Sequence, residues 1–194
     1  MLKSLLSLYN TKAYRPLFNV ALFSAITVVF HYVWWHGLVQ FLAGFGWFES
    51  FREMMVYAVF SQSAWIDEHI FGMEIVRQGT TIVFPGKGYV EIVESCSGTK
   101  QFYQILVLFL IIPGPWKHKA WYIPAAMLVM HATNVFRILV LSGMVLHAPQ
   151  HWDFVHDWIM RPFFYVVLFL LWVVWVEKFD KWKPTSATLS ETKG

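Results

Sequence analysis

The sequence predicts an all-α integral membrane protein with four clear transmembrane helices, and three observations support this fold class. Hydrophobic residues make up 57% of the 194 residues and charged residues only 14%, and the mean hydropathy is +0.49. The hydrophobic residues gather in long runs, which is typical of membrane helices and exceeds what a water-soluble core needs. Lysine and arginine cluster in short segments between these runs, as they do in membrane proteins with a defined orientation.

Four apolar stretches are expected to cross the bilayer. The first follows a short basic segment and ends in bulky aromatic residues without a small-residue cleavage site, so we interpret it as an uncleaved helix and not a signal peptide. The second is stopped by Pro113-Gly114-Pro115. The four predicted spans are Leu17 to Trp35, Thr99 to Ile112, Ala120 to about Leu146, and about Phe163 to Val176.

The region between the first two spans is less regular. Residues 37–72 are apolar but interrupted by charges and glycines, so we expect one or two interfacial, re-entrant or tilted helices over Leu38 to Phe48 and Phe51 to Ile70. Whether the second of these crosses the membrane stays open. The β-branched and aromatic stretches Thr80 to Phe84 and Tyr89 to Val93 flank a Pro/Gly turn and predict a short outer hairpin.

The positive-inside rule predicts the orientation. The N-terminus, the loop with Lys117 and Lys119, and the C-terminal tail belong in the cytoplasm, and residues 37–95 and 147–157 belong outside. We therefore expect a multi-pass protein of the cell inner (cytoplasmic) membrane, with the lipid bilayer as a partner and no nucleic-acid binding. Residues 1–178 are predicted to form a single transmembrane catalytic domain, and residues 179–194 a polar cytoplasmic tail that is disordered.

The only cysteine, Cys96, lies in the sequence ESCSGTK, between the predicted hairpin and the second span. A single cysteine excludes an intramolecular disulfide, and its commonest role is that of a small buried hydrophobe. Here Ser97 and Gly98 are poor core residues, and Glu94 and Lys100 place charge near the sulfur. The positive end of the following helix also favours a thiolate. We therefore predict a reactive thiol with these four neighbours as supporting residues.

A second polar group lies on the third predicted span. His131, Asn134 and Arg137 fall on one side of that helix at 100° per residue. An arginine inside a membrane helix costs about 2.5 to 3.5 kcal/mol on insertion and therefore needs a partner. Two interpretations are open: a structural ion pair with Glu91 or Glu94, or a functional cation close to a thiolate or a substrate.

The predicted outer loop before the last span is rich in histidine. Metal ligation by these residues is a weak alternative, so we predict no metal and no cofactor. His156 is the first candidate for an acid/base group because it precedes the last span and is followed by Asp157; His151 is the second. A thiolate, an imidazole and a guanidinium at one water-membrane boundary are the groups that acyl transfer requires. The polar residues of this loop are His147, His151, Asp153, His156 and Asp157.

With these residues, the chain resembles the exosortase/archaeosortase family of membrane-embedded cysteine proteases and transpeptidases. The matching motifs are Glu94-Ser95-Cys96-Ser97-Gly98, Asn134-Val135-Phe136-Arg137-Ile138 and His156-Asp157, in the family's order and each beside an apolar helix. The resemblance implies that Cys96 is the nucleophile, Arg137 the electrostatic stabiliser and His156 the acid/base, with Asn134 as a supporting residue. It also implies substrates that are exported proteins with a C-terminal sorting signal, cleaved on the outer face and passed to a surface acceptor, often during glycan-linked attachment.

Two hypotheses from other classes remain open. The first is a non-enzymatic membrane carrier of haem or metal, with His31, His36, His131 and the loop histidines as ligands, which gives Cys96 no role. The second is a scaffold of a surface-polymer assembly complex, supported by composition alone. The sequence leaves the sorting motif, the acceptor nucleophile and the oligomeric state undetermined.

Overall fold

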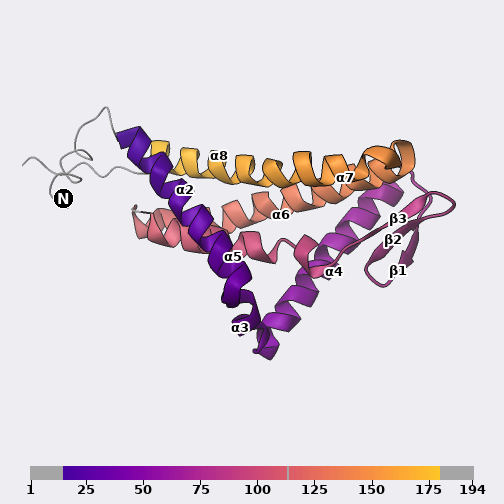
Figure 1. The fold of residues 1–194 in the computed structure, drawn as a ribbon, viewed down its shortest axis with the longest axis horizontal. Coiled ribbons are helices and arrows are strands. Elements are labelled where there is room, and N and C mark those ends of the chain that lie inside the picture. Colours follow the sequence, from indigo (N-terminus) through magenta and orange to yellow (C-terminus); the bar gives the residue numbers. More distant parts are fainter. Residues whose placement is uncertain (1–14, 113, 180–194) are drawn as a thin grey trace, which may run out of the picture.

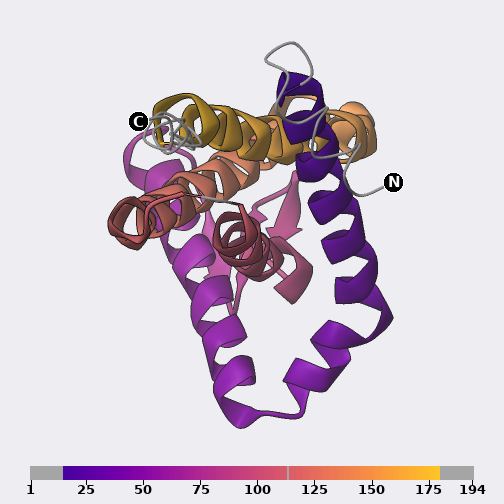
Figure 2. The same ribbon diagram turned by 90° about the vertical axis from the view of Figure 1, so that its left-hand side faces the viewer.

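The protein is a set of long helices with a small sheet at one end (Figure 1). The computed structural model describes residues 15–112 and 114–179. The helices α6 (Trp116–His147) and α8 (Arg161–Phe179) run side by side along the long axis of the molecule. The shorter α5 (Thr99–Ile111) packs against α6, and Figure 2 shows that it lies in the middle of the helices.

Three helical stretches are long and apolar enough to cross a membrane: Leu17–Ala43, Trp116–His147 and Pro149–Phe179. The chain is therefore a multi-pass membrane protein. The prediction of a fourth span is not confirmed, because α5 has only 13 residues. A helix of that length measures about 20 Å, whereas the hydrocarbon core of a bilayer is about 30 Å thick.

The first span extends beyond its predicted end at Trp35. After α2 (Arg15–Val33), the chain forms a π-helical turn, η1 (Trp34–Leu38), and continues as α3 (Val39–Ala43). The backbone leaves helical geometry at His36 and Gly37 inside this turn. Such a π-helical turn changes the direction of the chain but keeps the chain helical on both sides. The hydrophobic periodicity of the sequence therefore does not reveal it.

The irregular region after the first span is dominated by one helix. α4 (Gly46–His69) covers most of the predicted piece Phe51 to Ile70 and begins earlier, whereas α3 lies in the predicted piece Leu38 to Phe48. α4 runs obliquely from the end of α3 towards the sheet (Figure 1). It is not among the three helices apolar enough to span a membrane. One face packs on α6 through buried side chains, and this packing fixes its tilt. The buried apolar residues of α4 are Phe48, Met55, Val56, Val59, Phe60 and Ala64.

The predicted hairpin is present and has a third strand. β2 (Thr81–Phe84) pairs with β3 (Gly88–Glu91), and β1 (Val76–Gln78) pairs with the other edge of β2, both antiparallel. β1 has three residues, all exposed, so it shows no alternation from which a strand could be predicted. The inward side chains of the other two strands pack on α4 and α6 and so anchor the chain that leads to Cys96; they are Ile82, Phe84 and Val90.

The prediction that residues 147–157 form an outer loop is wrong for most of that segment. Its chain forms η3 (Pro149–His151), α7 (Trp152–Phe154) and the π-helical η4 (Val155–Met160), which continues into α8. The segment contains no glycine, and its proline occupies the first helical position, where proline is tolerated. The predicted domain boundary at residue 178 stays a prediction, and residues 1–14 and 180–194 lie outside the described residues.

Candidate active site

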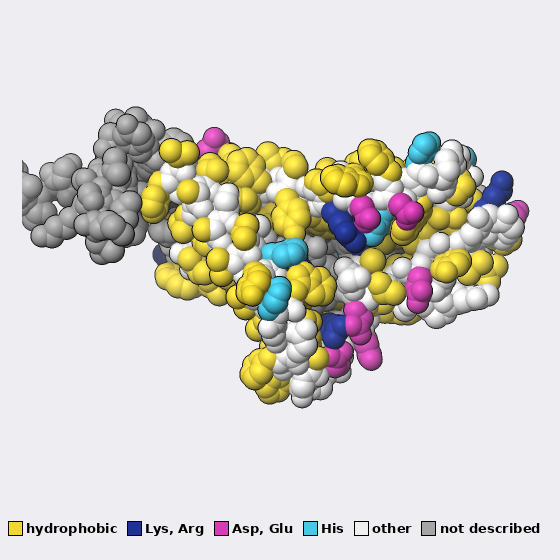
Figure 3. All heavy atoms as spheres, viewed as in Figure 1, with side chains coloured by type: hydrophobic (Ala, Val, Ile, Leu, Met, Phe, Trp, Pro, Cys, Tyr) yellow, Lys and Arg dark blue, Asp and Glu magenta, His cyan; other side chains and the backbone are white. Residues whose placement is uncertain are grey.

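A cavity of about 540 Å³ brings together the three residues that the motifs single out, Cys96, Arg137 and His156. Its walls come from the first span, α4, α5, α6 and α8. Figure 3 shows charged and histidine side chains around the middle of the face that it draws, whereas hydrophobic side chains cover much of the rest. The lining of the cavity includes the charged residues Glu94, Lys100 and Arg161, so a polar site lies among apolar helices.

Cys96 ends a single 3₁₀ turn, η2 (Glu94–Cys96), and its side chain is half-buried. Its backbone N–H donates to the carbonyl oxygen of Val93 at 2.8 Å, and that of Ser97 donates to the carbonyl oxygen of Glu94 at 3.1 Å. The helix α5 begins three residues later at Thr99. The thiol thus lies just before the start of a helix, where the sequence predicted it.

Ser97 and Gly98 shape the turn between Cys96 and α5. The buried Ser97 hydroxyl donates to the carbonyl oxygen of Glu94 at 2.7 Å and accepts from the Thr99 N–H at 3.2 Å. Gly98 has a φ of 83°, a left-handed conformation that glycine adopts without strain. A Cβ at this position would also lie 3.2 Å from Nδ2 of Asn134. The turn therefore requires glycine for two separate reasons.

Two side chains of α6 hold the Cys96 backbone. Asn134 donates from Nδ2 to the Cys96 carbonyl oxygen at 2.6 Å, and a terminal nitrogen of Arg137 donates to the same oxygen at 3.3 Å. Asn134 lies 13 residues before the end of α6 at His147, which corresponds to about 20 Å along the helix. The cysteine is therefore recessed between the helices and does not lie at their outer ends.

Arg137 is buried beside the cysteine. Its guanidinium lies 5.2 Å from the centre of the Phe164 ring, and one of its terminal nitrogens donates to the Cys96 carbonyl oxygen. The guanidinium forms no ion pair with Glu91 or Glu94 in the part of the chain that the structure describes. Of the two interpretations from the sequence, the geometry favours a cation held beside the cysteine over a structural ion pair with Glu91 or Glu94.

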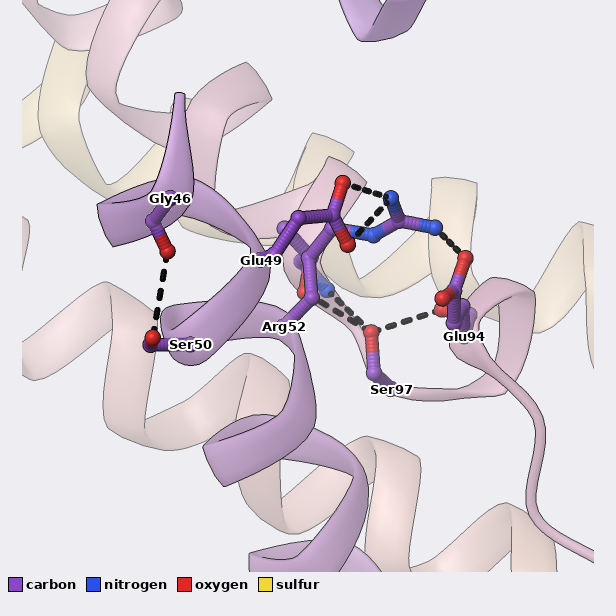
Figure 4. Close-up of polar contacts among 7 residues, drawn as sticks. Gly46, Glu49, Ser50, Arg52, Glu94 and Ser97 are labelled. Carbon is purple, nitrogen blue, oxygen red and sulfur yellow. Dashed lines mark hydrogen bonds and ion pairs between the residues drawn. The ribbon is translucent and has the colours of Figure 1, made fainter. Parts of the chain in front are cut away.

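Glu94 is paired with Arg52, a residue that the sequence did not single out. Arg52 donates to Glu49 at 2.8 Å and forms an ion pair with Glu94 on its other side. Figure 4 shows the guanidinium between the two carboxylates, with Ser97 close to Glu94. This network ties α4 to the cysteine turn. The only available sequence indication was the i, i+3 spacing of Glu49 and Arg52 within an apolar stretch.

His156 faces the cavity from η4. Its Nδ1 lies 2.7 Å from Oδ1 of Asp157, and its ring stacks on the Trp152 ring at 4.8 Å and 8°. Asp157 also forms an ion pair with Arg161 at 3.3 Å. A carboxylate at Nδ1 places a proton there and leaves Nε2 available for chemistry. The lining of the cavity includes His156 but not His151, so the geometry favours His156 as the acid/base.

Lys100 lies on another wall of the cavity. Its ammonium donates to Nδ1 of His31 at 2.7 Å, and the Tyr165 hydroxyl lies 3.1 Å from the same nitrogen. Burial lowers the pKa of Lys100 to about 8. The ammonium also lies 5.7 Å from the centre of the Trp35 ring. These contacts join the first span, α5 and α8 around the cavity, and the sequence did not predict this role for His31.

The described residues contain no set of metal ligands of the kind that the metal-carrier hypothesis requires. Across residues 15–112 and 114–179, no group of three or more His, Cys, Asp or Glu side chains could hold a metal ion. His131 instead forms a hydrogen bond with Gln62 of α4 at 3.1 Å, and His36 bonds within its own helix. His131 therefore has an interhelical structural contact.

The fold and the site define a multi-pass membrane protein whose helices enclose a cysteine, an arginine and a histidine around one cavity. The chain belongs to the transmembrane exosortase family, whose model matches residues 20–173. The match includes every residue that lines the cavity, and the resemblance inferred from the motifs is confirmed. No curated protein and no solved structure matches the chain.

Proposed function

We propose that this protein is a cysteine protease and transpeptidase that cleaves C-terminal sorting signals of exported proteins and transfers the cleaved proteins to a surface acceptor. The observation that carries the proposal is that Cys96, Arg137 and His156 line one cavity. Membership of the transmembrane exosortase family supports it. In this proposal the active site faces outward in the cytoplasmic membrane, an orientation that follows from the distribution of lysine and arginine and requires the chain to return to the cytoplasmic side between Cys96 and Lys117.

In the first half of the reaction, the Cys96 thiolate attacks the carbonyl carbon of the scissile peptide bond. The Arg137 guanidinium stabilises negative charge on the sulfur and on the developing oxyanion. His156 then gives a proton to the leaving amine as the carbon–nitrogen bond breaks, which leaves the substrate joined to Cys96 as a thioester. In the second half, the acceptor gives its proton to His156 and displaces the sulfur.

The recessed position of Cys96 fits a substrate that arrives as a membrane helix. The peptide bond next to such a helix enters between the helices of the enzyme at the depth of the cavity. A substrate that fills the cavity displaces water from Cys96 and thereby favours transfer to the acceptor over hydrolysis. A glycan of the cell surface is the acceptor class that the family resemblance implies.

The test is processing of a sorting-signal substrate in cells that carry variants of the enzyme. We expect Cys96→Ala, Arg137→Gln and His156→Gln to accumulate unprocessed precursor while each protein still inserts at wild-type levels. His151→Gln is the matched control, because His151 does not line the cavity, and it is expected to process normally. Normal processing by Cys96→Ala would contradict the proposal and favour a scaffold.

Labelling with a membrane-impermeant maleimide tests the orientation. Cys96 is the only cysteine, so any labelling of intact cells reports that thiol alone. We expect labelling without detergent. Labelling only after the membrane is opened would mean that the thiol is cytoplasmic or buried, and would contradict a site that is open to the outside.

A further inference from the structure

The outer edge of β3 carries unpaired backbone groups that the proposed chemistry does not use. In the three-stranded sheet β2 lies between β1 and β3, so each outer strand has one free edge. The Ile92 N–H donates to the Thr80 carbonyl oxygen at 3.0 Å, which continues the register of β2 and β3. Hydrogen-bonded pairs alternate along an antiparallel ladder. The backbone groups of Val90 and Ile92 therefore face β2, and those of Tyr89 and Glu91 face away from it.

These outward groups are open to a new partner. In the part of the chain that the structure describes, neither Tyr89 nor Glu91 forms a backbone hydrogen bond to a segment outside the sheet, and both residues are exposed. The inner face of the strand is covered instead. Val90 is 3% exposed, and a Cβ on Gly88 would lie 3.0 Å from the Val145 side chain of α6. α6 thus packs against the inner face of β3, and the free edge can accept another strand.

β3 leads directly to the cysteine. Its last residue, Glu91, lies five positions before Cys96, and the intervening Val93 carbonyl oxygen accepts from the Cys96 N–H at 2.8 Å. The other free edge, on β1, has only three residues, and Arg77 at its centre forms an ion pair with Glu68. A free edge that ends beside the nucleophile is therefore the one suited to hold an extended peptide in front of it.

We propose that the outer edge of β3 binds the substrate segment that precedes the scissile bond, as an added parallel strand. This inference rests on the proposed function. The membrane helix of the substrate follows the scissile bond, so the segment before that bond leaves the cavity towards the outer side. Figure 1 shows the sheet at the end of the molecule opposite to the start of α6, which is the outer end in the proposed orientation. β3 runs from that end towards Cys96, in the same direction as the substrate.

The parallel arrangement defines the hydrogen bonds. In a parallel pair, one residue bonds to two residues of the neighbouring strand that are two positions apart. One substrate residue therefore donates its N–H to the Tyr89 carbonyl oxygen and accepts from the Glu91 N–H with its own carbonyl oxygen. The substrate residue two positions later donates to the Glu91 carbonyl oxygen. The residue between them directs its backbone groups away from β3, so the contacts recur at every second substrate residue.

A series of ester substitutions along the substrate tests this pattern. Each ester replaces one backbone N–H before the scissile bond by an oxygen and so removes one donor. With the wild-type enzyme, we expect esters at every second position to lower kcat/KM about three- to tenfold. The esters between them should have a smaller effect. Binding of the same peptides to Cys96→Ala in detergent should show the same alternation without any chemistry.

Glu91→Pro removes the central N–H of the edge on the enzyme side. Proline is tolerated at edge positions whose N–H faces solvent, and the pairing of β3 with β2 does not use this group. We expect this variant to bind the peptides about three- to tenfold more weakly and to lose the alternation. Glu91→Ala, which keeps the N–H, should retain the alternation. Arg77→Pro is the matched control, because the same ladder directs its N–H to the free edge of β1, and it should keep both binding and alternation.

Photocrosslinking gives a second readout that removes no backbone group. Tyr89 is 64% exposed, so a photoreactive residue at this position would meet the side chains of an added strand. In Cys96→Ala, we expect crosslinks from position 89 to the substrate segment before the scissile bond, and none from position 77 on β1. If Glu91→Pro does not fold, these crosslinks and the ester series with the wild-type enzyme decide.

The outcomes separate the added strand from the proposed function. An ester series without alternation, or an alternation of equal size in the wild type and in a folded Glu91→Pro, overturns the added strand while leaving the transpeptidase intact. The absence of crosslinks from position 89, with a peptide that the wild-type enzyme cleaves, has the same meaning. If the wild-type enzyme neither binds nor cleaves the peptides, the proposed function fails, and the added strand fails with it.

Discussion

The Asn134 side chain of α6 donates a 2.6 Å hydrogen bond to the carbonyl oxygen of Cys96, the shortest link between the cysteine turn and the longest helix. This bond fixes the backbone of Cys96 against a rigid element. Arg137 lies almost one turn further along the same helix and binds the same carbonyl oxygen. The asparagine and the arginine of one motif therefore position the cysteine of another.

Removing the Asn134 amide should loosen the cysteine turn. We expect Asn134→Ala to lower the free energy of unfolding by about 1 to 3 kcal/mol, since a buried carbonyl loses its best donor, and to reduce processing at least tenfold. Thermal unfolding in detergent and the rate of Cys96 alkylation measure the two effects. Thr133→Val is the control, because the Thr133 hydroxyl bonds only within its own helix. Equal behaviour of the two variants would contradict this role of Asn134.

A side chain at position 98 should strain the same turn. We expect Gly98→Ala to destabilise the protein by about 1 to 3 kcal/mol, because of its φ of 83° and the 3.2 Å approach of a Cβ to Asn134. Gly46→Ala serves as the control, since a Cβ there meets nothing within 4 Å. The unfolding temperatures of the two variants measure this effect. If Gly98→Ala unfolds at the wild-type temperature, the turn relaxes to accept the side chain and the expected strain is contradicted.

The ion pair between Arg52 and Glu94 should couple α4 to catalysis. We expect Arg52→Met and Glu94→Gln each to lower processing several-fold, and the double variant to be little worse than either single one. The coupling energy should be below about 1 kcal/mol, because more than half of the Glu94 side chain is exposed. Arg77→Met, which breaks the exposed pair with Glu68, should leave processing unchanged. Strictly additive losses would contradict the coupling.

Asp67 should make stability depend on pH. Burial raises its pKa from 3.8 to about 6, and the Ser142 hydroxyl partly offsets this rise. Between these values the unfolded chain ionises while the folded chain stays protonated, so stability falls as pH rises from about 4 to 6 and stays low above that range. The shift corresponds to about 3 kcal/mol.

We therefore expect Asp67→Asn to be more stable than the wild type at pH 7 and similar to it at pH 3.5. Unfolding temperatures measured across this pH range provide the comparison. Glu68→Gln, a neighbouring exposed carboxylate, should leave the pH dependence as it is. A wild-type stability that does not fall between pH 4 and 6 would contradict the assigned burial of Asp67.

Asp157 should act through His156. We expect Asp157→Asn to lower processing about tenfold or more and to change its pH profile, because the carboxylate fixes the imidazole tautomer and orientation. The rate of Cys96 alkylation should stay close to that of the wild type. Asp153→Asn, on the preceding turn, is the control. A reduced rate with an unchanged pH profile would assign Asp157 a purely structural role.

The motifs predicted the family correctly because each combines a reactive residue with small or polar neighbours inside an otherwise apolar chain. One such local pattern is the order Cys96, Ser97, Gly98 in the chain. The other is Asn134 with Arg137, which helical spacing places on the same side of a helix. The roles assigned to these residues stay predictions. The identity of the acid/base was ambiguous in the sequence, since both His151 and His156 precede the last span, although only His156 is followed directly by an aspartate.

The sequence by itself determined that this is a multi-pass membrane protein and which residues are its chemical candidates. Hydropathy, motif spacing and helical periodicity are local properties, and each follows directly from the order of residues. Only the tertiary structure showed that α5 is too short to be a full span, that Arg52 is the partner of Glu94, and that Gln101 and Gln104 line the cavity. These features depend on how helices that are far apart in the sequence pack together. A contact between two such helices produces no periodic pattern in either of them, so the sequence alone does not predict it.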